Sequence, residues 1–461
     1  MTRKVRRVSV LLIAASLAAT CGARQPGTLP DWASPGLIGG GGWPYASQAV
    51  DPETAAGATY LPRSSVIELS DGRAFLIPFG GGAAVAMPRD DPQVATAVRN
   101  DSAWLASGTV PGRTDTERDM AARALLDLRL LTRPNGASTA SWYGAWNYVW
   151  PRDAAFSAAA FTVTGHPAEA RRILQFLARI QNKRGLWAAR YNADGTAVSD
   201  GRGVQLDGLG WALWATWLSH QADPPGTAEP TELWTMVRRA ADRMSRSLGA
   251  DGLPPRSSDY FERNPDTEQD PHRPTLGVVA PILTGLRVAT ALAAERGATV
   301  EAQRWQSAAR RVSAAIVREF KPYGYPRSPV PRGDMDAAVT FLAPPFAPPD
   351  PAVDAAVLTA EKRLALPDGG VLPGEHWQGN RTEAWTPETA MFALAAAASG
   401  RADEATGRLG WLADHRTSLG VLPEKVDRQG RPSSVAPLGW TASLVLLTFQ
   451  ALDHKLPTPG P

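Results

Sequence analysis

Most of the chain carries a helical pattern of apolar positions. From residue 114 onward apolar side chains recur every three or four residues, as Met120, Ala124 and Leu128 do, which places them on one face of a helix. The sequence TDTE at 114–117 has the form of a capping box and marks the first turn of that helix. The pattern predicts a mainly α protein of about twelve helices. They are expected at residues 114–131, 153–164, 167–182, 207–220, 230–247, 277–295, 299–319, 335–342, 351–363, 387–398, 402–414 and 437–452.

The chain before residue 111 has a different pattern. Residues 22–45 are rich in Pro and Gly and are typical of a linker. Further on, SSVIELSDGRAFLIPF has two β-prone runs on either side of Asp71-Gly72, which predicts a hairpin. We therefore expect a small β-containing region at 46–110, followed by one helical domain at 111–455.

Residues 1–21 have the form of an export signal. Four basic residues precede an apolar core at 8–19 that is too short and wrongly flanked to be a spanning helix. Cys21 ends this segment, and it is either the lipidation site of a bacterial lipoprotein or part of an ordinary signal peptide that is cut away. Ala18 and Thr20 stand where lipoprotein signals usually have Leu and then Gly or Ala, so both alternatives stay open. We expect an exported protein, lipid-anchored at Cys21 or secreted.

Charge and motif content exclude several classes of function. The net charge of +3 becomes about −1 once the basic head of the signal is removed, and no basic stripe or fingerprint supports nucleic-acid binding. Cys21 is the single cysteine, so an internal disulfide or a cysteine-ligated zinc site cannot form. The six histidines form no close pair and no HExxH motif, and neither a G-x-S-x-G elbow nor a phosphate loop is present. We expect no metal and no cofactor.

Tryptophan is abundant, with 16 Trp against 8 Tyr and 11 Phe. Indole faces stack on the apolar C–H faces of sugar rings, so tryptophans in loops favour a carbohydrate ligand. The alternative is that they belong to the core, as the helical spacing of Trp211, Trp214 and Trp217 indicates.

Two glutamates fit the chemistry of glycosidic bond cleavage. That reaction needs one protonated and one ionised carboxyl group, which stand roughly 6.5–9.5 Å apart in inverting enzymes. Glu262 follows Tyr260 and Phe261, and an acid packed against aromatic rings is desolvated, which raises its pKa and suits a proton donor. Glu424 lies in a loop beside Lys425, which favours the charged form of a base. Taken alone, either glutamate could be a surface residue.

Five motifs occur in the order seen in one enzyme family. This chain resembles the glucoamylase-like glycoside hydrolases, family 15, over about residues 115–453. The motifs are NYVWPRDAAFSAAAF (147–161), QLDGLGWALWA (205–215), DYFERNPD (259–266), GVLPEKVD (420–427) and PLGWTASLVLL (437–447).

The resemblance implies an (α/α)6 barrel with six inner and six outer helices. It also implies an inverting, exo-acting hydrolase of α-glucosidic bonds that needs no cofactor, with Glu262 as general acid and Glu424 as base. Arg152 and Asp153 would bind hydroxyls of the terminal sugar, although the pair could instead cap a helix start. The resemblance implies as substrate-binding residues Trp150, Arg152, Asp153, Asp207 and Trp440. Trp385 is added to them as one of the tryptophans in the loops.

The chain departs from the family at positions that bear on its substrate. Phe261 stands where the family usually has Trp, Arg263 follows the acid where an acidic or polar residue is common, and Trp440-Thr441 replaces a frequent Ser-His. Residues 46–110 are also too few for the β-sandwich that many bacterial members carry. The alternatives are a trehalase-type enzyme, a hydrolase of another envelope or storage glycan, and an exported carbohydrate-binding protein without catalysis.

Overall fold

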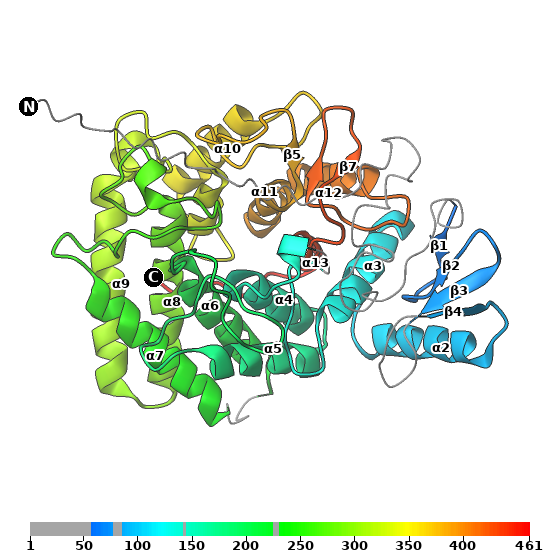
Figure 1. The fold of residues 1–461 in the computed structure, drawn as a ribbon. Helices are drawn as coiled ribbons and strands as arrows, with labels where there is room; N and C mark the ends of the chain where they lie inside the picture. The colour runs from blue at the N-terminus through cyan, green and yellow to red at the C-terminus, as the bar shows by residue number, and fades with distance from the viewer. Residues whose placement is uncertain (1–56, 77–84, 142–143, 225–229) are drawn as a thin grey trace, which may run out of the picture.

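The computed structural model describes residues 57–76, 85–141, 144–224 and 230–461 (Figure 1). The expected signal segment 1–21 with Cys21, the linker 22–45 and residues 46–56 lie outside these ranges.

Two concentric layers of helices form a closed barrel. Each inner element contacts the next, and the last contacts the first; each outer element packs against the inner layer. The inner elements in this cyclic order are α4 (Pro151–Val163), α6 (Asp207–Ala222), α8 (Leu276–Glu295), the 3₁₀ helix η4 (Ala337–Leu342), α11 (Thr386–Ala398) and α13 (Gly439–Asp453). The outer elements are α3 (Asp115–Leu131), α5 (Pro167–Ile180), α7 (Thr231–Ser247), α9 (Thr299–Glu319), α10 (Pro351–Leu364) and α12 (Ala402–Asp414). The mainly α fold and the (α/α)6 barrel are confirmed.

Hydrophobic patterning explains which helices lie inside. The outer helices α5 and α7 bury one face only, as amphipathic surface helices do. The inner helices α4, α6, α11 and α13 are buried almost all round. Helix α8 is long and apolar enough to cross a membrane by length and composition, but 83% of its most apolar window is buried inside the protein.

Several elements differ from the sequence-based expectation. The inner segment expected as a helix at 335–342 is the short 3₁₀ helix η4, and α2 (Pro92–Ser107) was not expected at all. Helix α2 begins at the cap Asp91, whose side chain accepts a hydrogen bond from Gln93 N. The helix expected at 387–398 is α11, which begins one residue earlier, at Thr386, with Trp385 as its N-cap.

A small antiparallel sheet lies beside the barrel, next to α3 (Figure 1). Its strands pair in the order β1 (Thr59–Tyr60), β2 (Ile67–Glu68), β3 (Arg73–Leu76) and β4 (Val85–Pro88). The hairpin expected at Asp71-Gly72 joins β2 and β3, and Gly72 has the positive φ of 80° that the turn requires. Helix α2 packs on β3 and α3, so it joins the sheet to the barrel.

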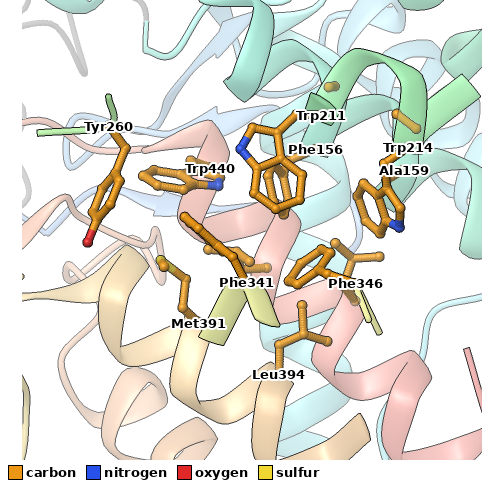
Figure 2. Close-up of a cluster of buried hydrophobic side chains, with 14 of the residues drawn as sticks. Phe156, Ala159, Trp211, Trp214, Tyr260, Phe341, Phe346, Met391, Leu394 and Trp440 are labelled. Atoms are coloured by element: carbon orange, nitrogen blue, oxygen red, sulfur yellow. The ribbon is translucent and has the colours of Figure 1, made fainter. Parts of the chain in front are cut away.

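An aromatic cluster fills the centre of the barrel (Figure 2). Trp211 and Trp214 of α6 are fully buried there, with edge-to-face contacts to Phe346 at ring-centre distances of 4.9 and 5.0 Å. For these tryptophans the core alternative therefore holds.

Helices α6 and α8 meet through their backbones at a pair of glycines. A Cβ atom on Gly210 would lie 1.9 Å from the carbonyl oxygen of Pro281, and one on Gly285 would lie 2.7 Å from Gly210 Cα. Neither neighbour is a flexible side chain, so an added methyl group forces the two helices apart.

Gly210→Ala is therefore expected to lower the free energy of unfolding by about 2–3 kcal/mol, the scale of core overpacking. Gly407→Ala on α12 is the matched control, because nothing lies within 4 Å of its Cβ position and alanine favours a helix by up to about 1 kcal/mol. Urea unfolding measures the free energy of unfolding of both variants. Equal stability of the two variants would contradict the close packing.

Candidate active site

The candidate residues gather where the N-termini of the inner helices converge. Arg152 and Asp153 lie in the first turn of α4, Asp207 begins α6, Glu388 lies in the first turn of α11, and Trp440 in that of α13. The loops that precede these helices carry the other candidates. Aligned peptide dipoles make a helix N-terminus favourable for acidic groups, so this end of the barrel suits several carboxyls.

A cavity of about 250 Å³ opens at this end. Both glutamates singled out from the sequence, Glu262 and Glu424, line it. Of the other expected residues, Asp207 lies behind the lining and contacts it through Arg152. The lining includes Trp146, Trp150, Arg152, Asp153, Arg202, Tyr260, Phe261, Glu262, Trp377, Trp385, Glu388, Glu424 and Trp440.

Glu262 lies on a loop whose backbone is unusual. Its φ of 56° is in the left-handed region, which a non-glycine residue seldom occupies. The carboxylate accepts hydrogen bonds from Trp150 Nε1, from Gln205 Nε2 at 3.0 Å and from Arg202. Three donors therefore orient Glu262 towards the cavity.

The two aromatics before Glu262 anchor its loop. Tyr260 packs edge-on against Trp440 at a ring-centre distance of 6.0 Å and belongs to the aromatic cluster of the barrel (Figure 2). Phe261 packs edge-on against Trp377 at 5.3 Å. The side chain of Glu262 itself is 25% exposed and contacts Arg202, which the sequence did not single out.

A buried arginine holds the same loop from behind. Arg327 pairs with both carboxylate oxygens of Glu268 at 2.6 and 2.8 Å, with Asp336 at 2.6 Å and with Asp259 at 3.0 Å. Its guanidinium also stacks on Phe261, 3.8 Å from the ring centre. This one side chain thus joins four groups around the loop that carries Glu262.

Glu424 is a more buried carboxyl than Glu262. It is 7% exposed, and it accepts hydrogen bonds from Trp146 Nε1 at 3.0 Å and from Ser434 Oγ. Burial raises its pKa, while Ser434, Lys425 and Trp146 oppose that rise. Thr386 fixes the backbone, since its N–H donates to Glu424 O at 3.0 Å. Ser434, Lys425 and Trp146 thus favour the ionised form that a base needs, while burial works against it.

Arg152 and two acids form a buried network beneath the cavity. Arg152 contacts Asp207 at 3.0 Å and Asp153 at 3.2 Å, and its guanidinium lies 4.9 Å from the ring centre of Trp440. Burial alone would lower the pKa of Arg152, but Asp153 and Asp207 raise it. Burial raises the pKa of each of these two acids to about 6, although Arg152 opposes the rise. Arg152, Asp153 and Asp207, which were predicted to bind the sugar, thus form one charged cluster.

Glu388 is a cavity residue that sequence reasoning missed. It is 2% exposed, and its Oε2 accepts no hydrogen bond within the described chain. Burial raises its pKa to about 8; its own backbone opposes the rise and Glu424 adds to it. The sequence signal available was an acidic residue in a predicted first turn, which is also a common surface feature.

The raised pKa of Glu388 predicts a pH-dependent stability. Between its ordinary value of 4.5 and about 8 the folded protein keeps a proton that the unfolded chain releases. The free energy of unfolding therefore falls as pH rises through this window, by at most about 1.4 kcal/mol per pH unit from this group. Urea unfolding at several pH values should show that Glu388→Gln falls less steeply than the unaltered protein. Parallel profiles would contradict the assignment.

Several buried polar atoms around the cavity lack a protein partner. They make no hydrogen bond with any other group of the described chain, although buried polar groups are normally paired. A ligand rich in hydroxyls could satisfy them, because each hydroxyl both donates and accepts. The atoms are Tyr260 Oη, Trp377 Nε1, Trp385 Nε1, Trp440 Nε1, Arg152 Nε and Glu388 Oε2.

The described residues contain no group of three or more His, Cys, Asp and Glu side chains arranged to hold a metal ion.

Comparison with known proteins gives structural neighbours only. No family model matches the chain. No curated protein matches it either. A wild-type glycosidase superposes with a TM-score of 0.62 at 20% identity, over 74% of this chain and 99% of that one. A bacterial glucoamylase in complex with acarbose superposes with a TM-score of 0.61 at 15% identity, over 81% of this chain and 63% of that one. The glucoamylase of Saccharomycopsis fibuligera superposes with a TM-score of 0.57 at 13% identity, over 75% of this chain and 96% of that one.

A glycosidase variant in complex with glucose also superposes, with a TM-score of 0.62 at 20% identity over 74% of this chain and 99% of that one. At these identities the likeness establishes architecture. The chain has the (α/α)6 fold of the glucoamylases and related glycosidases.

Proposed function

We propose that this protein is a glycoside hydrolase that removes a terminal sugar from an α-glucosidic chain with inversion of configuration. The observation that carries the proposal is that Glu262 and Glu424 line the same cavity, whose wall is rich in tryptophan. The two glutamates are 162 positions apart in the sequence (424 − 262). The structural neighbours named as glucoamylases, one with acarbose bound, support the same class of reaction.

In the proposed mechanism Glu262 protonates the glycosidic oxygen of the leaving group. Glu424 removes a proton from water, and the water oxygen attacks the anomeric carbon from the opposite face. The C–O bond to the leaving group breaks as the new one forms, so the product has the inverted configuration. Arg152 and Asp153 bind the terminal sugar, and Trp150, Trp385 and Trp440 form the cavity wall.

Arg202 sets a condition on this mechanism. A guanidinium in contact with a carboxylate stabilises its charged form, whereas a general acid must carry a proton. Arg202 therefore has to leave Glu262 when the leaving group of the substrate arrives. The same contact favours a second candidate, a sugar-binding protein in which Arg202 stays paired with Glu262 and no bond is cleaved.

A substrate panel separates these candidates. The purified protein is incubated with maltooligosaccharides, trehalose and a mannoside, and the released sugars are quantified. Hydrolysis of maltooligosaccharides is expected, including those blocked at the reducing end, while a block at the non-reducing end should abolish it. Turnover of trehalose alone would support the trehalase-type alternative. Sugar binding without any turnover would favour the binding protein.

We propose export as part of the function, because the signal-like segment 1–21 precedes the described fold. Its test is cell fractionation with a Cys21→Ala variant. A lipid-anchored protein is expected to leave the membrane fraction when Cys21 is replaced. A secreted one should not change its distribution.

A further inference from the structure

Glu388 is a buried cavity group for which the proposed mechanism has no role. Its position is fixed by the start of α11, where Trp385 N donates to Val371 O at 2.9 Å and Thr386 N donates to Glu424 O at 3.0 Å. The side chain lines the cavity and is 2% exposed, and its Oε2 has no hydrogen-bond partner within the described chain. A buried carboxyl oxygen without a partner is costly unless a ligand binds it.

The charges around Glu388 favour a neutral carboxyl. The groups that act on it are Glu424 from the loop before β6 (Lys425–Val426), Arg152 from α4 and Asp336 before η4. The phenol of Tyr260 is also close enough to interact electrostatically with Glu388. Two of the three charged neighbours are acids, so an ionised Glu388 would place a second negative charge beside Glu424. Burial acts in the same direction, since it disfavours the charged form.

We propose that Glu388 is a sugar-binding residue of this cavity, whose neutral carboxyl group donates a hydrogen bond to a ring hydroxyl and so selects an uncharged sugar. The inference rests on the proposed function for the class of ligand. A neutral carboxyl group both donates and accepts, as a hydroxyl does, so the two are complementary. A uronic acid would instead bring its carboxylate beside three acids, Asp153, Glu262 and Glu424. The two arginines of the lining, Arg152 and Arg202, are already paired with Asp153 and Glu262.

Binding should therefore weaken when Glu388 ionises. Glucose does not titrate in this range, so a change in its affinity reports on the protein. The dissociation constant for glucose is expected to rise about tenfold between about pH 7 and about pH 9, the scale of one lost hydrogen bond. These two pH values lie on either side of the pKa of Glu388, about 8, and above the pKa of Asp153, about 6.

The test measures binding of glucose and of glucuronate to the full chain by calorimetry at both pH values. Glu388→Gln keeps a donor and an acceptor but cannot ionise, so it should bind glucose with nearly the same affinity at both. Glu388→Met keeps the length without hydrogen bonding and should bind about tenfold more weakly at both. Glu404→Gln on the exposed surface of α12 is the control and should behave as the unaltered protein.

The outcomes separate this inference from the proposed function. A Glu388→Gln variant that keeps the original pH dependence overturns the inference, as does a Glu388→Met variant with unaltered affinity, glucuronate binding as tight as glucose binding, or no glucose binding at all. If Glu388→Met does not fold, the pH dependence of glucose binding by Glu388→Gln alone decides whether the inference stands. Binding that follows the expected pattern without hydrolysis of any panel sugar would overturn only the proposed function.

Discussion

Glu424→Gln is expected to lower kcat by at least about 10²-fold with little change in KM, the usual scale for a general acid–base group. Glutamine keeps the size of the side chain. Its carbonyl oxygen can accept the hydrogen bond from Trp146 while its NH2 group donates to Ser434 Oγ, so the cavity should keep its shape. It cannot take a proton from water, so the loss falls on the chemical step. Steady-state kinetics on the best substrate of the panel measure this, and Glu404→Gln is the surface control.

A substrate with a good leaving group distinguishes the base from the acid. Glu262→Gln should lose a similar factor on maltose, but much less on α-glucosyl fluoride, because fluoride needs little protonation to leave. Glu424→Gln should be impaired on both substrates, since each requires activated water. Equal losses for the two variants on the fluoride would contradict the assignment of roles.

Arg327→Met is expected to lower the free energy of unfolding by about 3–5 kcal/mol, because it leaves buried carboxylates without their cation. Asp259, Glu268 and Asp336 share this guanidinium, and burial raises the pKa of Asp336 to about 6 although Arg327 opposes the rise. The loop that carries Glu262 lies between these groups. Activity should therefore fall even under conditions where the variant remains folded.

Urea unfolding and kinetics at the same temperature test both consequences. Arg246→Met on α7 is the control, because its pair with Asp242 lies on the surface with the arginine side chain 69% exposed. A surface ion pair contributes at most about 1 kcal/mol. If the two arginine variants lose the same stability, the buried network does not hold the loop.

The fold could be predicted from sequence where short-range signals suffice. The capping box at 114–117 forms as expected, since Thr114 accepts from Glu117 N and Glu117 accepts from Thr114 N. The hairpin at Asp71-Gly72 likewise follows from local turn chemistry. The short η4 was expected as a helix because its apolar residues resemble one, but it has only six residues and is 3₁₀ in form.

The site was less accessible to sequence reasoning because it is assembled from distant loops. Glu262 and Glu424 were found through motifs, but Arg202 lies in a Gly-rich loop without any periodic pattern, and it meets Glu262 only in the folded chain. Arg327 was one cation among 48 Lys and Arg residues, and nothing local indicates that three acids surround it. Glu388 was missed for the same reason. In the sequence, an acidic residue in the first turn of a surface helix cannot be distinguished from one that lines a cavity.

The central claim is that Glu262 and Glu424 hydrolyse an α-glucosidic bond by single displacement. Proton NMR of the first product released from maltotriose tests it most directly, because the anomeric proton reports the configuration before mutarotation. The account predicts that β-glucose appears first, and that neither anomer forms at a comparable rate with Glu424→Gln. Initial release of α-glucose would contradict it.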